Sequence, residues 1–287
     1  MPALVERYAT IAGYGVGHAS PAAARPYPVS WQTGVGGFAA GLLISMITSP
    51  VGVSGAVFLL PVQLSLLHVP NPAVTPTNLL FNVVSGPGAL ARYRRTGQLT
   101  GPLTRLLLAG TLPGVAAGAC LRVFALPGPH VFRLVAAAVL LPLGLWLCAR
   151  ALRRDGRDRP PLSRRAVLGL GLAVGTVGGV YGIGGGSILG PLLAGRGTPL
   201  TRIAPAALAC TFLTSITGAA VYGLLALTTS GDIAPHWSLG LLCGAGGLIG
   251  GYLGARLQPR LPERALRLLL GVLATALAAL YLAQGIT

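Results

Sequence analysis

Small neutral polar residues and glycines gather in two short stretches of an otherwise apolar chain. One is GGVYGIGGGSILGPLLAG, residues 178–195, and the other is VGVSGAV, residues 51–57. A glycine in a helix interior costs about 0.5–1 kcal/mol relative to alanine, so both stretches predict broken helices. A break frees backbone N–H groups that carry partial positive charge and bind anions.

Hydroxyl and amide side chains near these breaks would complete an anion site that needs no fixed cation. Any one Ser or Thr in a membrane helix can instead bond the carbonyl one turn back. We expect Gly184–Ser187 and Val53–Val57 to face each other and to present N–H groups to the anion. The predicted substrate-binding residues are Ser54, Gly55, Asn78, Asn82, Ser85, Gly184, Gly185, Gly186, Ser187, Thr211 and Ser215.

No Asp, Glu, Lys, Arg or His lies at the centre of a predicted span. Acid–base, metal and nucleophilic chemistry need such groups in a pocket, and proton-coupled carriers usually keep an intramembrane carboxylate or histidine. We therefore predict a protein that is not an enzyme and has no catalytic residue, no metal site and no cofactor. The cysteines show no metal or redox spacing: Cys120, Cys148, Cys210 and Cys243.

The composition indicates an all-α, polytopic integral membrane protein. Of 287 residues, 53% are hydrophobic and 9% are charged, and the mean hydropathy is +0.73. Crossing a bilayer takes about 20 apolar residues. Runs near that length cover 103–124, 131–149, 203–229, 238–255 and 266–283.

All 21 basic residues are arginines, and the formal net charge is +16. In a membrane protein this balance indicates positive-inside topology and attraction to anionic lipid. Nucleic-acid binding would need a basic face on a soluble domain, and no such domain is predicted. The expected partners are a small anion and the lipid bilayer. The protein itself is expected to be a monomer or a homodimer.

The sequence aligns weakly with itself when its first half is laid over its second half without a gap. Gly41, Gly52, Gly55 and Pro61 then align with Gly171, Gly182, Gly185 and Pro191. We call this constant shift, which takes Gly41 to Gly171, the repeat offset. These residue types are fixed by backbone geometry, so the match predicts two structural repeats. The predicted organisation is a mobile tail 1–33, a first repeat 34–151, an Arg-rich cytoplasmic linker 152–165 and a second repeat 166–287.

The arginines orient the repeats. With the linker and the arginines at 92–105 and 256–267 inside, tracing backwards makes 166–194 a hairpin that starts and ends inside. By the same trace 34–67 is a hairpin that starts and ends outside. The turns are expected at 178–184 and at Ser49–Pro50. Each repeat is then a broken-helix hairpin plus three transmembrane helices, in opposite orientations. Both termini are predicted to lie outside the cytoplasm, at the cell membrane.

Other interpretations of the same features remain open. The glycines would serve close helix packing alone if they recurred at every fourth position along one face. A lipid-handling protein would need a polar groove open to lipid, and a channel would need a continuous polar stripe.

Two halves that each open with a hairpin of the form G-x-G-G-G-x-x-x-x-P resemble the sulfite exporter TauE/SafE family of permeases. Gly182, Gly184–Gly186 and Pro191 match this pattern, and 211–218 resembles the polar helix that follows it. Ser54 and Ala56 stand where glycines are usual in the first half. The resemblance covers about 34–282 and implies transport of small sulfur oxyanions or organosulfonates, export of sulfite above all.

Overall fold

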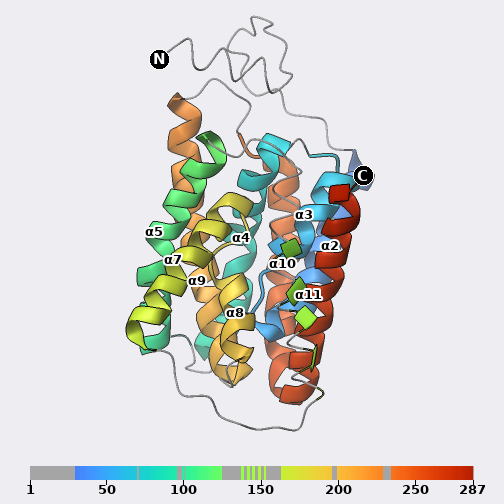
Figure 1. The fold of residues 1–287 in the computed structure, drawn as a ribbon. Coiled ribbons are helices and arrows are strands. Elements are labelled where there is room, and N and C mark those ends of the chain that lie inside the picture. The colour runs from blue at the N-terminus through green and yellow to red at the C-terminus, as the bar shows by residue number, and fades with distance from the viewer. Residues whose placement is uncertain are drawn as a thin grey trace, which may run out of the picture.

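The structure is a computed structural model that describes residues 30–69, 71–95, 99, 101–124, 163–195, 199–228 and 234–286, with isolated positions between 137 and 152. Its described elements are helices without a strand among them (Figure 1). Five are long and apolar enough to cross a membrane, which confirms the all-α polytopic class. The bounds are α2 Trp31–Thr48, η1 Ser49–Val51, α3 Ala56–Ser65, α4 Asn71–Arg95, α5 Pro102–Phe124, α7 Arg164–Tyr181, α8 Gly186–Gly195, α9 Leu200–Thr228, α10 Trp237–Leu257, η2 Gln258–Arg260 and α11 Glu263–Ile286.

The apolar runs at 103–124, 203–229, 238–255 and 266–283 match α5, α9, α10 and α11 to within three residues at each end. The run at 131–149, the tail 1–33 and the linker 152–165 lie wholly or largely outside the described residues. Where the repeats are described, α2 begins at Trp31 and α7 at Arg164, slightly before the expected starts at 34 and 166.

Both predicted hairpins are present, and each turns at a left-handed glycine. Gly52 closes the first turn with φ 75° and ψ 23°, and Gly182 closes the second with φ 66° and ψ 17°. The first break spans residues 49–55, and the second spans 182–185, at the end of the expected window. The returning helices α3 and α8 have 10 residues each. At 1.5 Å per residue they cover about 15 Å, half of a bilayer core.

A tyrosine holds each hairpin at an equivalent place. Tyr93 of α4 donates its hydroxyl hydrogen bond to the carbonyl of Ser49 at 3.3 Å. Tyr222 of α9 donates to the carbonyl of Gly179, also at 3.3 Å. Ser49 and Gly179 correspond to each other at the repeat offset, so these two bonds reproduce in space the alignment found in the sequence.

The two hairpins open toward opposite ends of the bundle (Figure 1). Hairpin α2–α3 opens at the end where α11 finishes, and hairpin α7–α8 opens at the end where α11 starts. The turn at Gly52 packs against the start of α9, and the turn at Gly182 packs against the start of α4. A Cβ placed on Gly52 would lie 2.5 Å from Ala204 Cα, and one on Gly182 would lie 2.4 Å from the Thr75 carbonyl oxygen.

Most other glycines serve contacts between the repeats. Helix α5 packs in parallel against α7, so that Gly110, Gly114 and Gly118 of α5 each approach an α7 carbonyl, and a Cβ on Gly118 would lie 2.1 Å from the Thr176 oxygen. Helix α2 packs in parallel against α10, where Gly246, Gly250 and Gly254 approach α2 carbonyls in the same way. The chain therefore uses glycine for packing at every fourth position here, and for left-handed turns at the hairpins.

The glycine packing predicts a matched pair of variants. Gly118→Val adds a branched side chain against the α7 backbone, and overpacking of this kind destabilises by about 1–3 kcal/mol. Gly169→Val adds one where nothing lies within 4 Å, so it should be silent. Thermal unfolding in detergent should show a lower transition temperature for Gly118→Val only. Equal transition temperatures would contradict this packing.

Candidate functional site

The two hairpin breaks meet in the interior of the protein. The backbone N–H of Ser54, in the first break, donates to Ser187 Oγ at the start of α8, 3.3 Å away. Ser187 Oγ in turn donates to the Ile183 carbonyl at 2.9 Å. The segments expected to face each other therefore touch, and part of their hydrogen bonding is already used within the protein.

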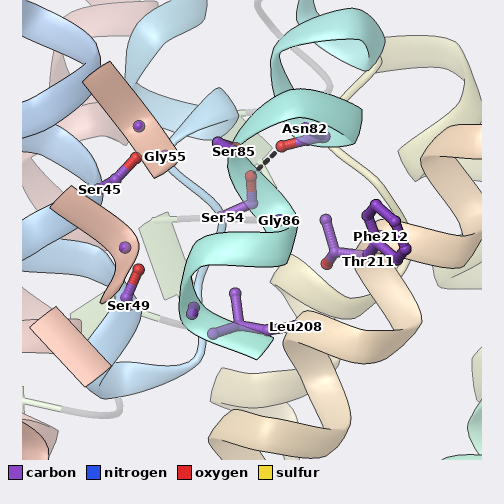
Figure 2. Close-up of a pocket in the computed structure, with 13 residues that line it drawn as sticks. Ser45, Ser49, Ser54, Gly55, Asn82, Ser85, Gly86, Leu208, Thr211 and Phe212 are labelled. Carbon is purple, nitrogen blue, oxygen red and sulfur yellow. Dashed lines mark hydrogen bonds between the residues drawn. The ribbon is translucent and has the colours of Figure 1, made fainter. Parts of the chain in front are cut away.

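Two asparagines of α4 tie the breaks to the central helix. Ser54 Oγ donates a hydrogen bond to Asn82 Oδ1 (Figure 2), and Asn82 Nδ2 donates to the Gly182 carbonyl at 3.3 Å. Asn78 Nδ2 donates to the Ala56 carbonyl at 2.9 Å. Asn82 thus bridges both hairpins, and the geometry gives Ser54, Asn78 and Asn82 a positioning role.

A small cavity lies against the first break, between α2, α4, α9 and α10 (Figure 2). Its volume is about 20 Å³, which is room for about one water molecule. We name it the serine cavity. Its lining residues are Ser45, Ser49, Ser54, Gly55, Asn82, Ser85, Gly86, Ala89, Leu208, Thr211, Phe212, Gly247 and Gly251.

Several donors in the serine cavity are free to bind a ligand. In the described part of the chain no hydrogen bond engages the hydroxyls of Ser45, Ser49 and Ser85 or the N–H of Gly55. Thr211 is 3% exposed, and its Oγ1 also lacks a partner among the described residues. No lining residue is charged. Neutral hydroxyl and N–H donors suit an oxyanion, which offers only acceptors.

The glycines of the second break are packed rather than open. The N–H of Gly185 donates to Thr214 Oγ1 at 3.1 Å, so it is not free for an anion. Gly185 also has no positive φ, which belongs to Gly182 and Gly184 instead. A Cβ on Gly186 would lie 1.8 Å from the Ala207 carbonyl oxygen. Gly184, Gly185, Gly186, Ser187 and Ser215 do not line the serine cavity, whereas Ser54, Gly55, Asn82, Ser85 and Thr211 do.

Sequence reasoning missed the contribution of α2 and α10 to the cavity. Ser45 continues the buried stripe of Gly34, Gly37 and Gly41 on α2, a spacing of three to four residues that marks one helix face. Gly247 and Gly251 have the same spacing on α10. Both signals were present in the sequence, but only packing of the halves brings them together.

The fold and the glycine breaks agree with one known family. The family model described as sulfite exporter TauE/SafE matches residues 37–281, nearly the whole chain. None of the curated proteins compared with the chain is significantly similar to it. The match covers both hairpins and the helices that hold them. The chain belongs to the sulfite exporter TauE/SafE family, a family of membrane permeases.

Proposed function

We propose that this protein exports a small sulfur-containing anion, sulfite or an organosulfonate, through the serine cavity. The observation that carries the proposal is a buried cavity whose free groups are neutral hydrogen-bond donors. Sulfite and sulfonates present oxygen acceptors to such donors. Family membership supports the substrate class.

Neutral donors suit transport because the anion must leave as well as bind. A buried cation would attract an anion strongly, and conduction or release requires binding weak enough to be reversed. Three serine hydroxyls, the Thr211 hydroxyl and the Gly55 N–H replace part of the hydration shell without a fixed charge. The substrate is therefore held by hydrogen bonds that form and break readily.

The serine cavity lies toward the arginine-bearing end of the bundle. Its α4 lining ends at Ala89, one turn before Arg92, and its α10 lining ends at Gly251, shortly before Arg256. A surface of one charge raises the local concentration of the opposite ion. Anions would gather at this end, which the positive-inside rule assigns to the cytoplasm. This arrangement supports export.

The small volume of the cavity supports an alternating-access cycle. About one water fits, whereas sulfite has four heavy atoms, so the described conformation is nearly closed. In inverted-repeat transporters, one part of the protein rocks against another around a fixed site. Here the broken hairpins, joined through Ser54, Asn82 and Gly182, are the elements that would move.

The direct test is efflux from proteoliposomes with labelled sulfite, sulfoacetate, sulfate, chloride and acetate. We expect sulfite or the sulfonate to leave fastest, with saturation. Fastest transport of another anion would assign the cavity to that anion instead. Leakage of every anion without saturation would indicate a channel. Movement of fluorescent lipid between leaflets without anion flux would indicate a lipid-handling protein.

Ser49→Ala and Ser85→Ala should each weaken anion binding. A hydrogen bond to a charged group is worth about 1.5–3 kcal/mol, so each loss should raise KM by about 10–100-fold. Thr217→Ala is the matched control because its hydroxyl bonds the Leu213 carbonyl on an exposed face. Unchanged KM in both serine variants would remove the cavity as the substrate site.

Transport should not depend on any carboxylate of the protein. The sequence predicts that the five acidic residues lie outside the membrane spans, and the described residues that line the serine cavity include no carboxylate. Neutralising Glu6, Asp155, Asp158, Asp232 or Glu263 one at a time should leave turnover within a few-fold. Loss of transport in one correctly inserted variant would show that a carboxylate takes part.

Both chain ends should lie outside the cytoplasm, as the arginine distribution requires. Fusion reporters at residues 5 and 285 should give an external signal, while a reporter at Asp155 should give a cytoplasmic one. A cytoplasmic signal at either end would contradict the orientation and, with it, the assigned direction of transport.

A further inference from the structure

Gln63 is a fully buried amide in α3 whose two polar atoms have no partner. Its exposed fraction is 0%, and neither Nε2 nor Oε1 bonds any group in the described part of the chain. An unpaired buried polar group costs about 1–3 kcal/mol, and native proteins pair nearly all such groups. The fold would be more stable with an apolar side chain at this position.

The internal repeat indicates that the architecture itself does not require the amide. At the repeat offset, position 63 corresponds to position 193, which is a leucine in α8. Leu193 is buried, at 5% exposure. Leucine is close to glutamine in size and has no polar atom to satisfy. The same structural place is therefore filled by an apolar side chain in one half and by an unpaired amide in the other.

Gln63 lies beyond the serine cavity, away from the arginine-bearing end. It is two helical turns along α3 from Ala56, about 10 Å at the helical rise. The chain after α3 lies beside the start of α2, since Leu67 is a neighbour of Gly37. Helix α3 thus leads from the cavity level toward the end where α2 begins.

Other unpaired buried groups lie at the serine cavity or on its outward side. Thr211 Oγ1 is at the cavity, and Ser215 Oγ is one turn further along α9 in the outward direction. Asn78 Oδ1 is one turn outward of Asn82 on α4. Asn78 also holds the Ala56 carbonyl of α3. From the level of the cavity outward, α4, α9 and α3 therefore each carry an unpaired buried polar group: Asn78, Ser215 and Gln63.

We propose that Gln63 lines the outward half of the transport path and donates its amide N–H to the departing anion. In the described conformation this half is closed, and its polar groups have no ligand. When the hairpins move, the outward half opens and the amide meets the anion or its water. Gln63 is then retained for transport at a cost in stability. This inference rests on the proposed function for the anion, for the serine cavity as its site and for the movement of the hairpins.

The first test compares Gln63→Leu with Leu60→Met, a volume-conserving change at a buried neighbour on the same helix. We expect Gln63→Leu to lower the efflux rate at least tenfold while its thermal transition stays equal or rises. Leu60→Met should keep the wild-type rate. A wild-type rate in Gln63→Leu, or a lower transition temperature that accounts for the lost transport, would overturn the proposal.

The second test does not depend on the substrate. Gln63→Cys and Val115→Cys are treated in proteoliposomes with a membrane-impermeant anionic methanethiosulfonate, applied at the end opposite the Arg-rich linker. Wild-type protein with its native cysteines gives the baseline. Both positions are 0% exposed, but only Gln63→Cys should be labelled, because Val115 is on α5, which does not line the serine cavity. Equal labelling of the two variants would overturn the proposal.

The two tests separate this inference from the proposed function. If wild-type protein carries no sulfur anion, the proposed substrate is wrong, and the Gln63→Leu comparison is made with the anion that it does carry. Labelling of Gln63→Cys above Val115→Cys would still support an outward path at Gln63. Sulfur-anion transport with no labelling at Gln63→Cys would leave the function in place and contradict the role of Gln63.

Discussion

A helix that breaks inside a bilayer must find protein partners for its freed backbone groups, because lipid offers none. The carbonyls in and beside each break meet that requirement with side chains from neighbouring helices, so the breaks fix where those helices lie. The bonds to these carbonyls are Tyr93 to Ser49, Tyr222 to Gly179, Asn82 to Gly182, Asn78 to Ala56 and Gln258 to Pro50. The central pair α4 and α9 supplies four of these five donors. The main role of these polar side chains in the core is therefore to satisfy backbone carbonyls.

Glycine and proline positions in the sequence predicted the two broken-helix hairpins that the structure contains. Gly52 and Gly182 have a left-handed backbone, which few residues other than glycine adopt. Both halves therefore carry glycine at this position, although most other equivalent positions differ in residue type. The arginine pattern predicted the opposite opening of the hairpins for a similar reason, since charge cannot rest in the hydrocarbon region. The packing role of Gly110, Gly114 and Gly118 was not predicted, because it depends on which helix lies alongside α5.

The position of the cavity could not be predicted from the sequence, because it arises where the two halves differ. Ser45 and Ser49 of the first half correspond at the repeat offset to Gly175 and Gly179. The backbone of α5 occupies the space that a side chain would take at those glycines. A Cβ on Gly179, for example, would lie 2.3 Å from the Val115 oxygen. Asn82 corresponds to Phe212, which lines the serine cavity from α9. The two halves share a scaffold, and these differences give the first half free hydroxyls where the second half has glycines.

The central claim is that these neutral donors hold the transported anion, and anomalous diffraction with selenite tests it most directly. Selenite has the shape and charge of sulfite and carries a scatterer that can be located by its own signal. The account predicts one selenium peak within hydrogen-bond reach of the hydroxyls of Ser45, Ser49 and Ser85 and the N–H of Gly55. Selenium found only beside the arginines at the end of the bundle where α11 starts, with the serine cavity holding water alone, would contradict it.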